Sequence, residues 1–103
     1  MLDLTSANFK NEVEEYKGLV VIDIWATWCG PCKMIAPIID SLEEEMPDVK
    51  FCKINVDNEP GLTKLFKVSS IPTVAVVKDN VLLDMSVGYV MKDKLRAFIE
   101  QYK

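Results

Sequence analysis

The sequence predicts an α/β fold in which a mixed central sheet of four to five strands is flanked by four helices. Helix-like and strand-like segments alternate through the first half of the chain, which is typical of parallel strands joined by right-handed crossovers. In the second half only Asp79 and Asn80 separate two strand-like segments, which predicts an antiparallel hairpin. Half of the 103 residues are apolar, and this length fits a single domain over residues 1–103.

The first helix is predicted to begin after Thr5, whose hydroxyl can accept a hydrogen bond from a free N–H of the first turn. Its apolar side chains recur at helical spacing: Phe9, Val13 and Tyr16. Gly18 is expected to end this helix, and a short strand at residues 2–4 is expected to precede it.

The segment Leu19–Trp25 is rich in β-branched residues, which is typical of a strand covered on both faces. A turn at residues 26–31 then opens a second helix, which Pro47 and Asp48 end. Its apolar face carries Ile35, Ile38, Ile39, Leu42 and Met46. Pro37 lies inside this helix, but the apolar stripe keeps its phase past it, so we predict one kinked helix rather than two.

The remaining elements follow from the same patterns. A strand is predicted over Val49–Val56, and Asp57-Asn58-Glu59-Pro60 are predicted to cap a short helix with inward side chains at Leu62, Leu65 and Phe66. The hairpin strands are Thr73–Lys78 and Val81–Val87, and Gly88 ends the second of them. A terminal amphipathic helix carries Met91, Leu95, Phe98, Ile99 and Tyr102 on its apolar face.

Composition excludes several classes of protein. The chain has no histidine, which rules out catalytic pairs of serine or cysteine with histidine and histidine-dependent zinc sites. A net charge of −4 without a basic stretch argues against nucleic-acid binding. The amino-terminal stretch lacks the features of a signal peptide, and the longest apolar segment is too short to span a membrane. We therefore expect a soluble protein of the cytoplasm.

A Cys-Gly-Pro-Cys motif lies where the first long strand turns into the second helix. Cys29 and Cys32 are three residues apart, a helical spacing that brings two thiols close enough for a disulfide. A helix amino terminus also stabilises a thiolate. Cys29, which we expect to be the more exposed thiol, is the predicted nucleophile, and Cys32 is the predicted resolving thiol. Pro31 fits the first helical turn.

The alternative for such a motif is half of a structural zinc site, which needs four ligands from cysteine and histidine. Only Cys52 remains as a further thiol, so a redox role is favoured and no metal site is expected. Cys52 lies in a strand between Phe51 and Ile54, which predicts an inert thiol in the core.

Asp23 interrupts an apolar strand shortly before the cysteine motif. Burial between Ile22 and Ile24 would raise its pKa and suit it to take the proton of Cys32. The pattern is equally compatible with an aspartate at an uncovered patch of the sheet, where it would serve only solubility.

The residues alone do not decide the role of Lys53 or whether the peptide bond before Pro72 is cis or trans. Lys53 lies on the same side of its strand as Phe51, and it is either a partner of Asp23 or, as the pattern by itself favours, a lysine with a partly buried stem. Pro72 stands at a strand entrance, where its peptide bond can be cis, although most such bonds are trans.

The stretch from Trp25 to Lys33, WATWCGPCK, resembles the active-site signature of the thioredoxin family. The resemblance runs the whole chain, with thioredoxin-like spacings at Asp23, Pro37, Lys53-Ile54-Asn55-Val56-Asp57, Ile71-Pro72-Thr73 and Val87-Gly88. A CxxC motif alone is moderately specific, whereas WCGPCK with a downstream IPT and a terminal glycine is very specific. The resemblance implies the thioredoxin fold.

The same resemblance implies roles for individual residues. Asp23 would be the buried carboxylate that serves Cys32, and Lys53 would be its neighbour. Pro72 would be cis and would pack against the disulfide. A substrate-binding groove would be lined by Trp28, Gly30, Pro31, Ile71, Pro72 and Gly88, and backbone groups near Ile71 would hold the client chain as an added strand.

The activity implied by the resemblance is general protein-disulfide reduction by a monomer that itself binds no cofactor. Electrons would come from NADPH through a flavoprotein thioredoxin reductase. Clients would include ribonucleotide reductase, peroxiredoxins and methionine sulfoxide reductase. The uncharged Gly-Pro spacer supports the reducing direction. Two alternatives remain: a dedicated reductant or isomerase with a narrow client set, and a non-enzymatic binding module of a larger assembly.

Three positions depart from the family pattern. Met91 stands where many members carry a serine or threonine that caps the last helix. Tyr89 follows Gly88 where a smaller residue is common, and Ser70 precedes Ile71 where glycine is frequent. None of these positions lies in the cysteine motif.

Overall fold

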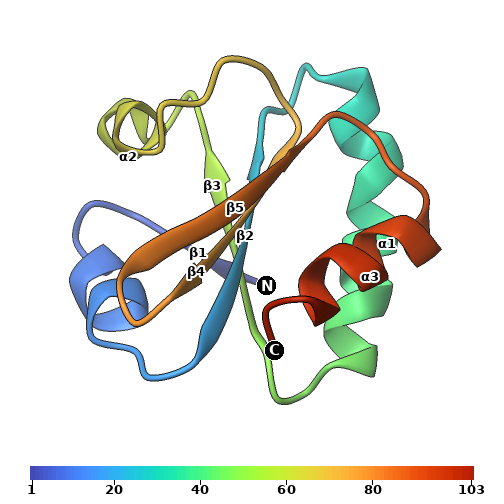
Figure 1. Cartoon of the computed structure of the whole chain (residues 1–103). Helices are drawn as coiled ribbons and strands as arrows, with labels where there is room; N and C mark the ends of the chain where they lie inside the picture. Colours follow the sequence, from blue (N-terminus) through green and yellow to red (C-terminus); the bar gives the residue numbers. More distant parts are fainter.

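The computed structural model describes residues 1–103 and contains one mixed sheet with the strand order β1-β3-β2-β4-β5 (Figure 1). Strands β1 (Leu2–Asp3) and β2 (Leu19–Trp25) both run parallel to β3 (Lys50–Asn55). Strand β4 (Thr73–Lys78) is antiparallel to β2, and β5 (Val81–Val87) is antiparallel to β4. The predicted mixed sheet is therefore confirmed, including the short first strand.

Four helices cover the two faces of this sheet (Figure 1). Helices η1 (Lys10–Glu14) and α2 (Pro60–Leu65) pack on one face, and α1 (Gly30–Glu45) and α3 (Lys92–Glu100) pack on the other. Each face buries its own apolar cluster. The predicted arrangement of helices on both faces is confirmed.

Side chains alternate along β2, which sets the position of its one acidic residue. Val20, Ile22 and Ile24 belong to the cluster beneath η1 and α2, whereas Val21 belongs to the cluster beneath α1 and α3. Successive residues of a strand point to opposite faces, so Asp23 lies on the same face as Val21, toward α1. The β-branched run thus places a carboxyl group under the helix that carries the cysteine motif.

The first helix differs from the prediction in type and length. Thr5 Oγ1 accepts a hydrogen bond of 3.2 Å from the N–H of Asn8, but this bond lies in the turn before the helix, whose N-cap is Phe9 and has no side-chain capping bond. The helix, however, is a short π-helix that ends at Glu14. Gly18 does not end it; with φ +125° this residue instead leads the chain into β2. Phe9 and Val13 are both buried in the core, and the residues after Glu14 lead back to the sheet.

Helix α1 runs without interruption through Pro37, so the prediction of one helix rather than two is confirmed. Pro37 is exposed, and its ring and missing N–H therefore disturb only the solvent side of the helix. The inner face buries Ile35, Ile39 and Leu42, as predicted, whereas Ile38 is half-buried.

The short helix α2 departs from the prediction at two points. Its N-cap, Glu59, makes no side-chain capping hydrogen bond, and the first turn is instead opened by Pro60. Leu62 and Phe66 are buried, but Leu65 is 60% exposed rather than inward. Leu62 and Phe66 fill the row that faces the core, and Leu65 falls outside it although its spacing of three residues from Leu62 also allows an inward side chain.

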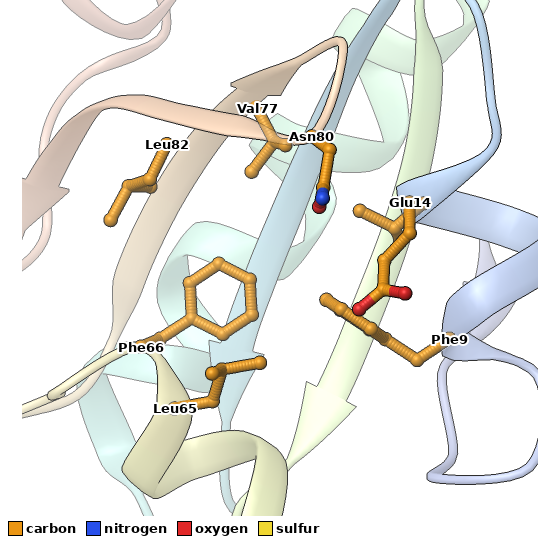
Figure 2. Close-up of a pocket in the computed structure, with 8 residues that line it drawn as sticks. Phe9, Glu14, Leu65, Phe66, Val77, Asn80 and Leu82 are labelled. Atoms are coloured by element: carbon orange, nitrogen blue, oxygen red, sulfur yellow. The ribbon is translucent and has the colours of Figure 1, made fainter.

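Leu65 instead lines a pocket of about 310 Å³ between η1, α2 and the β4–β5 hairpin (Figure 2). The other lining residues are Phe9, Val13, Glu14, Phe66, Val77, Asn80 and Leu82. Val77 pairs with Val20 near the start of β2, whereas the cysteine motif follows the end of that strand. This pocket therefore lies away from the cysteines.

The hairpin and the last helix largely follow the prediction. Asp79 and Asn80 adopt φ values of 50° and 63°, as expected for the tight turn between β4 and β5. Leu95 and Ile99 are buried beneath α3. Met91 does not join them: it is the N-cap of α3, is 72% exposed and offers no capping oxygen. No helix of the chain has the length and hydropathy needed to cross a membrane.

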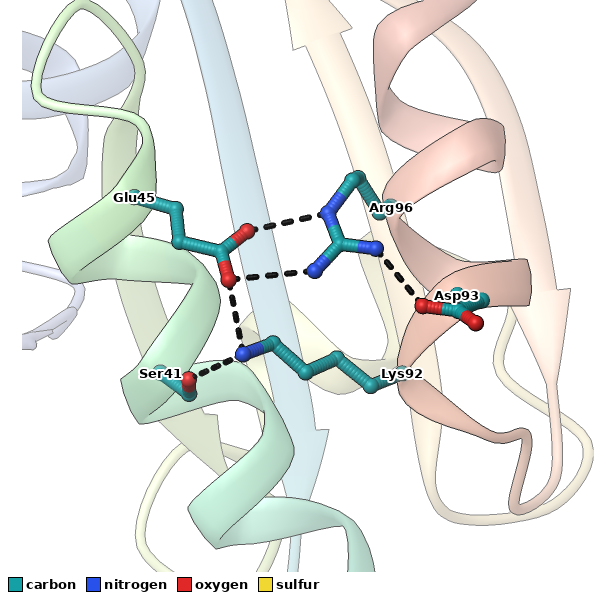
Figure 3. Close-up of polar contacts among 5 residues, drawn as sticks. All are labelled: Ser41, Glu45, Lys92, Asp93 and Arg96. Carbon is teal, nitrogen blue, oxygen red and sulfur yellow. Dashed lines mark hydrogen bonds and ion pairs between the residues drawn. The ribbon is translucent and has the colours of Figure 1, made fainter.

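A polar cluster joins α3 to α1 (Figure 3). The carboxylate of Glu45 accepts two hydrogen bonds from Arg96, at 2.9 and 3.0 Å, and pairs with Lys92 at 2.7 Å. Arg96 also binds Asp93, and Lys92 reaches Ser41. The hydrogen bonds from Arg96 and Lys92 lower the pKa of Glu45 to about 2. This cluster holds α3 across the carboxyl-terminal half of α1.

Candidate active site

Cys29 and Cys32 are joined by a disulfide at the amino-terminal end of α1, with 5.3 Å between their Cα atoms. Cys29 is the N-cap of the helix, and its Sγ accepts a hydrogen bond of 3.2 Å from the N–H of Cys32. The first N–H groups of a helix have no partner within the helix, so this sulfur takes the place of a capping oxygen. The same N–H and the helix dipole would stabilise a negative charge on Cys29.

The disulfide is well covered. Cys29 is 5% exposed and Cys32 is 3% exposed, so Cys29 is the more accessible residue by a narrow margin. Both pack with Ala26, and the partly buried side chains of Val56 and Ile71 pack against them. The exposures therefore order the two cysteines as the sequence predicts, with Cys29 ahead of Cys32.

Asp23 is 4% exposed, which excludes the interpretation of an aspartate at an uncovered patch. Burial raises its pKa from 3.8 to about 7, against the opposing effect of the Lys53 ammonium; the Asp40 carboxylate raises it further. A carboxyl group with a pKa near neutrality can both accept and release a proton under ordinary conditions.

Asp23 and Cys32 line the same pocket of about 160 Å³. The other lining residues are Met1, Trp25, Lys33, Ala36, Asp40 and Lys53. Two buried polar atoms in this region lack a hydrogen-bond partner: Oδ1 of Asp23 and Nε1 of Trp25. The unpaired carboxyl oxygen is thus free to take part in proton transfer on the inner side of the disulfide.

Lys53 is the register neighbour of Asp23 on the adjacent parallel strand. Its ammonium nevertheless pairs with Asp3, at 3.8 Å from Oδ1, and lies 5.5 Å from the centre of the Trp25 ring. The side chain is 31% exposed, so its stem is largely covered while its charge reaches the rim. Lys53 is therefore a strand neighbour of Asp23, as the resemblance implies, but its ion pair is with Asp3 rather than with Asp23.

Of the predicted groove residues, Ile71 packs against the cysteines, and the structure does not join the set in one pocket. Trp28 is 68% exposed and lines a shallow depression with Ile71. Pro72 is buried after a cis peptide bond, and its carbonyl accepts a hydrogen bond of 2.8 Å from the N–H of Gly88. Gly30 and Pro31 are exposed at the start of α1.

Three acidic residues near the site were not predicted from the sequence to contact site residues. Asp40 follows Cys32 and Ala36 at intervals of four residues, and this helical spacing could have placed it over Asp23. Asp57 accepts a hydrogen bond from the Trp28 indole, and Asp3 pairs with Lys53. Those contacts join segments that are distant in the sequence, so no local sequence pattern predicts them.

Cys52 is fully buried in the cluster beneath η1 and α2, as predicted, and burial raises its pKa to about 11. It is the one free cysteine of the chain. The structure assembles no group of three or more cysteine, aspartate or glutamate side chains suited to hold a metal ion.

Comparison with known proteins assigns the chain to a family. The model of the thioredoxin family matches residues 1–101. A thioredoxin from Listeria monocytogenes is 41% identical over 101 residues, which cover 97% of this chain and 96% of the relative. Thioredoxins from Bacillus subtilis and Chlamydia caviae are 41% and 46% identical, over 95% and 82% of this chain and 93% and 83% of the respective relatives. With a cysteine pair poised at a helix terminus and a full-length match, this chain belongs to the thioredoxin family of thiol–disulfide oxidoreductases.

Proposed function

We propose that residues 1–103 form a single thioredoxin domain that reduces protein disulfides in general, with Cys29 as nucleophile and Cys32 as resolving thiol. The observation that carries the assignment of roles is the position of the Cys29 sulfur, which caps α1 and accepts the N–H of Cys32. Any charge on this sulfur is stabilised there, whereas Cys32 lies one turn inside the helix, beside Asp23.

The reaction proceeds by two exchanges between sulfur atoms. The Cys29 thiolate attacks one sulfur of the client disulfide; that bond breaks, one client thiolate leaves and takes up a proton, and a mixed disulfide remains. The Cys32 thiolate then attacks Cys29, which releases the second client thiolate and forms the Cys29–Cys32 disulfide. Two electrons pass from the dithiol to the client.

Asp23 accepts the proton of Cys32 before the second exchange. Its carboxyl lines the same pocket as Cys32 and has a pKa of about 7, so a substantial fraction is ionised and able to accept a proton at neutral pH. Lys53 limits how far burial raises that pKa, because its ammonium favours the carboxylate.

The client chain binds across the exposed end of the site. Trp28, Gly30 and Pro31 are exposed and offer one margin beside Cys29. The half-buried Ile71 and Gly88, with the buried Pro72 after Ile71, offer the other margin. The client backbone pairs with groups near Ile71 in an extended conformation. Contacts to backbone rather than to particular side chains suit a reductase with many clients.

The domain returns to its dithiol form through a flavoprotein thioredoxin reductase that draws electrons from NADPH, and it holds no cofactor or metal of its own. It acts as a monomer in the cytoplasm, where it carries electrons to ribonucleotide reductase, peroxiredoxins and methionine sulfoxide reductase and so maintains the cellular thiol balance. The resemblance to the thioredoxin family and the uncharged Gly-Pro spacer support this route.

Insulin reduction tests the proposal. The purified chain should accelerate precipitation of the insulin B chain with dithiothreitol, and then with NADPH and a thioredoxin reductase in its place. The double variant Cys29→Ser, Cys32→Ser is the matched control and should be inactive in both assays. Failure of the unmodified chain with dithiothreitol would overturn general reductase activity, and success with dithiothreitol but not with reductases of several sources would overturn the proposed electron route.

A further inference from the structure

Lys53 lies between two aspartates in the sheet. Its backbone is in register with Asp3 on β1 and with Asp23 on β2, so the three residues form one row across β1, β3 and β2. Side chains in register on neighbouring strands point to the same face, so two carboxyl groups flank one ammonium. The two differ in environment, because Asp23 is 4% exposed whereas the side chain of Asp3 is 72% exposed.

The ammonium of Lys53 pairs with the outer aspartate. Its Nζ lies 3.8 Å from Oδ1 of Asp3, and Oδ1 of Asp23 has no hydrogen-bond partner. The two aspartates line different pockets, and Lys53 and Trp25 line both. Lys53 therefore forms the wall between the inner pocket, which contains Cys32, and the outer pocket, which contains Asp3.

We propose that Asp3 is a positioning residue for the site: it holds the Lys53 ammonium on the β1 side of the row and so leaves the Asp23 carboxyl without a close counter-ion. This inference rests on the role proposed above for Asp23. The buried carboxyl then keeps enough affinity for a proton to accept one from Cys32 and release it again. An ammonium hydrogen-bonded to Asp23 would favour a permanently ionised carboxylate.

Other charged and titratable groups face Asp23 from the helix packed above it. Asp40, Lys33 and Cys32 on α1 line its pocket, and the amino group of Met1 lines it as well and pairs with Glu43. All of these groups are still present when Asp3 is changed. A variant at Asp3 therefore tests only the charge at the outer end of the row.

Replacement of Asp3 should shift the pKa of Asp23 in one direction. Asp3→Asn removes one negative charge from the row and releases the Lys53 ammonium to approach Asp23, and both effects favour the Asp23 carboxylate. The pKa of Asp23 should therefore fall. The stability of the fold should change little, because an exposed ion pair contributes little to it.

The experiment is a carbon-13 NMR titration of aspartate carboxyl groups in the oxidised protein, in which neither cysteine of the disulfide titrates. From its starting value of about 7, the pKa of Asp23 should fall in Asp3→Asn by about half a unit at low salt, and less at high salt. Asp3→Glu keeps the charge and should restore the original value. Asp48→Asn is the matched control, since Asp48 is also exposed and pairs with a lysine, Lys103, outside the row.

The same titration in a Lys53→Met variant tests whether Asp3 acts through Lys53. In Lys53→Met, the change Asp3→Asn should have a clearly smaller effect on the pKa of Asp23. An unchanged pKa in Asp3→Asn, an equal fall in Asp48→Asn, or an undiminished fall in the Lys53→Met background would each overturn the proposal. The titration needs no turnover, so it can fail or succeed independently of insulin reduction, which tests the proposed function itself.

Discussion

The indole N–H of Trp28 donates a hydrogen bond of 2.8 Å to Oδ2 of Asp57. The bond ties the residue before the cysteine motif to the segment that follows β3, although the two residues are far apart in the sequence. Trp28 is 68% exposed, and this hydrogen bond helps to orient its ring over the shallow depression that it lines with Ile71.

Asp57→Ala should therefore impair client binding more than stability. Loss of the acceptor releases the Trp28 ring, and the KM for insulin should rise while kcat changes less. The free energy of unfolding should fall by less than about 1 kcal/mol, because the bond is exposed. Asp57→Asn retains an acceptor oxygen and should keep most of the affinity; an equal rise in KM for both variants would contradict a role for the hydrogen bond.

Cys32→Ser should trap a stable mixed disulfide with a client protein, because the attacking thiolate of the second exchange is missing. Non-reducing electrophoresis and mass spectrometry should locate the bond at Cys29. Cys29→Ser should trap nothing, and the reverse pattern would mean that the two roles are exchanged. Cys52→Ser in the same background should leave trapping unchanged, since this thiol is fully buried and has a pKa of about 11.

Asp23→Ala should change how stability depends on pH. The folded protein keeps the Asp23 proton up to about pH 7, whereas the unfolded chain releases it near pH 3.8. The contribution of Asp23 is therefore most favourable below pH 3.8 and is lost as pH rises to about 7. Since one pKa unit corresponds to about 1.4 kcal/mol, the loss is at most roughly 4 kcal/mol.

Urea titrations at a series of pH values measure this effect. The stability of the variant relative to the unmodified protein should rise between pH 4 and pH 8, whereas the cost of the small cavity left by alanine does not vary with pH. A constant difference across this range would contradict the raised pKa. Turnover should be slower in the variant at every pH, because Cys32 loses its proton acceptor.

Met91→Ser should stabilise the last helix. The backbone of Met91 is already extended, with φ −70° and ψ 159°, which suits an N-cap, and only a capping oxygen is missing. A serine hydroxyl should raise the free energy of unfolding by about 0.5 to 2 kcal/mol in chemical denaturation. Met91→Ala supplies no acceptor and should give no such gain; an equal gain for alanine would mean that removal of the exposed methionine, rather than capping, is responsible.

Much of the fold is predictable because local sequence patterns, such as strand-like runs and turn residues, indicate the same elements. The run Leu19–Trp25 and the turn pair Asp79-Asn80 predict the bounds of β2, β4 and β5. The predictions that were wrong lie where packing overrides periodicity. Leu65 has the spacing of an inward residue, but it is 60% exposed, and Leu62 and Phe66 take the buried positions. The first helix ends at Glu14, although the apolar spacing continues to Tyr16.

The amino-acid sequence alone specifies the reactive pair, because the spacing of Cys29 and Cys32 at a helix start is a local feature of the chain. The environment of that pair depends on the fold. Burial of Asp23 requires α1 to cover β2, and the row formed with Lys53 and Asp3 requires three strands to meet in register. Desolvation of Asp23 and pairing between strands arise only from contacts between distant segments. The pKa of the Asp23 carboxyl is therefore set by the assembled sheet.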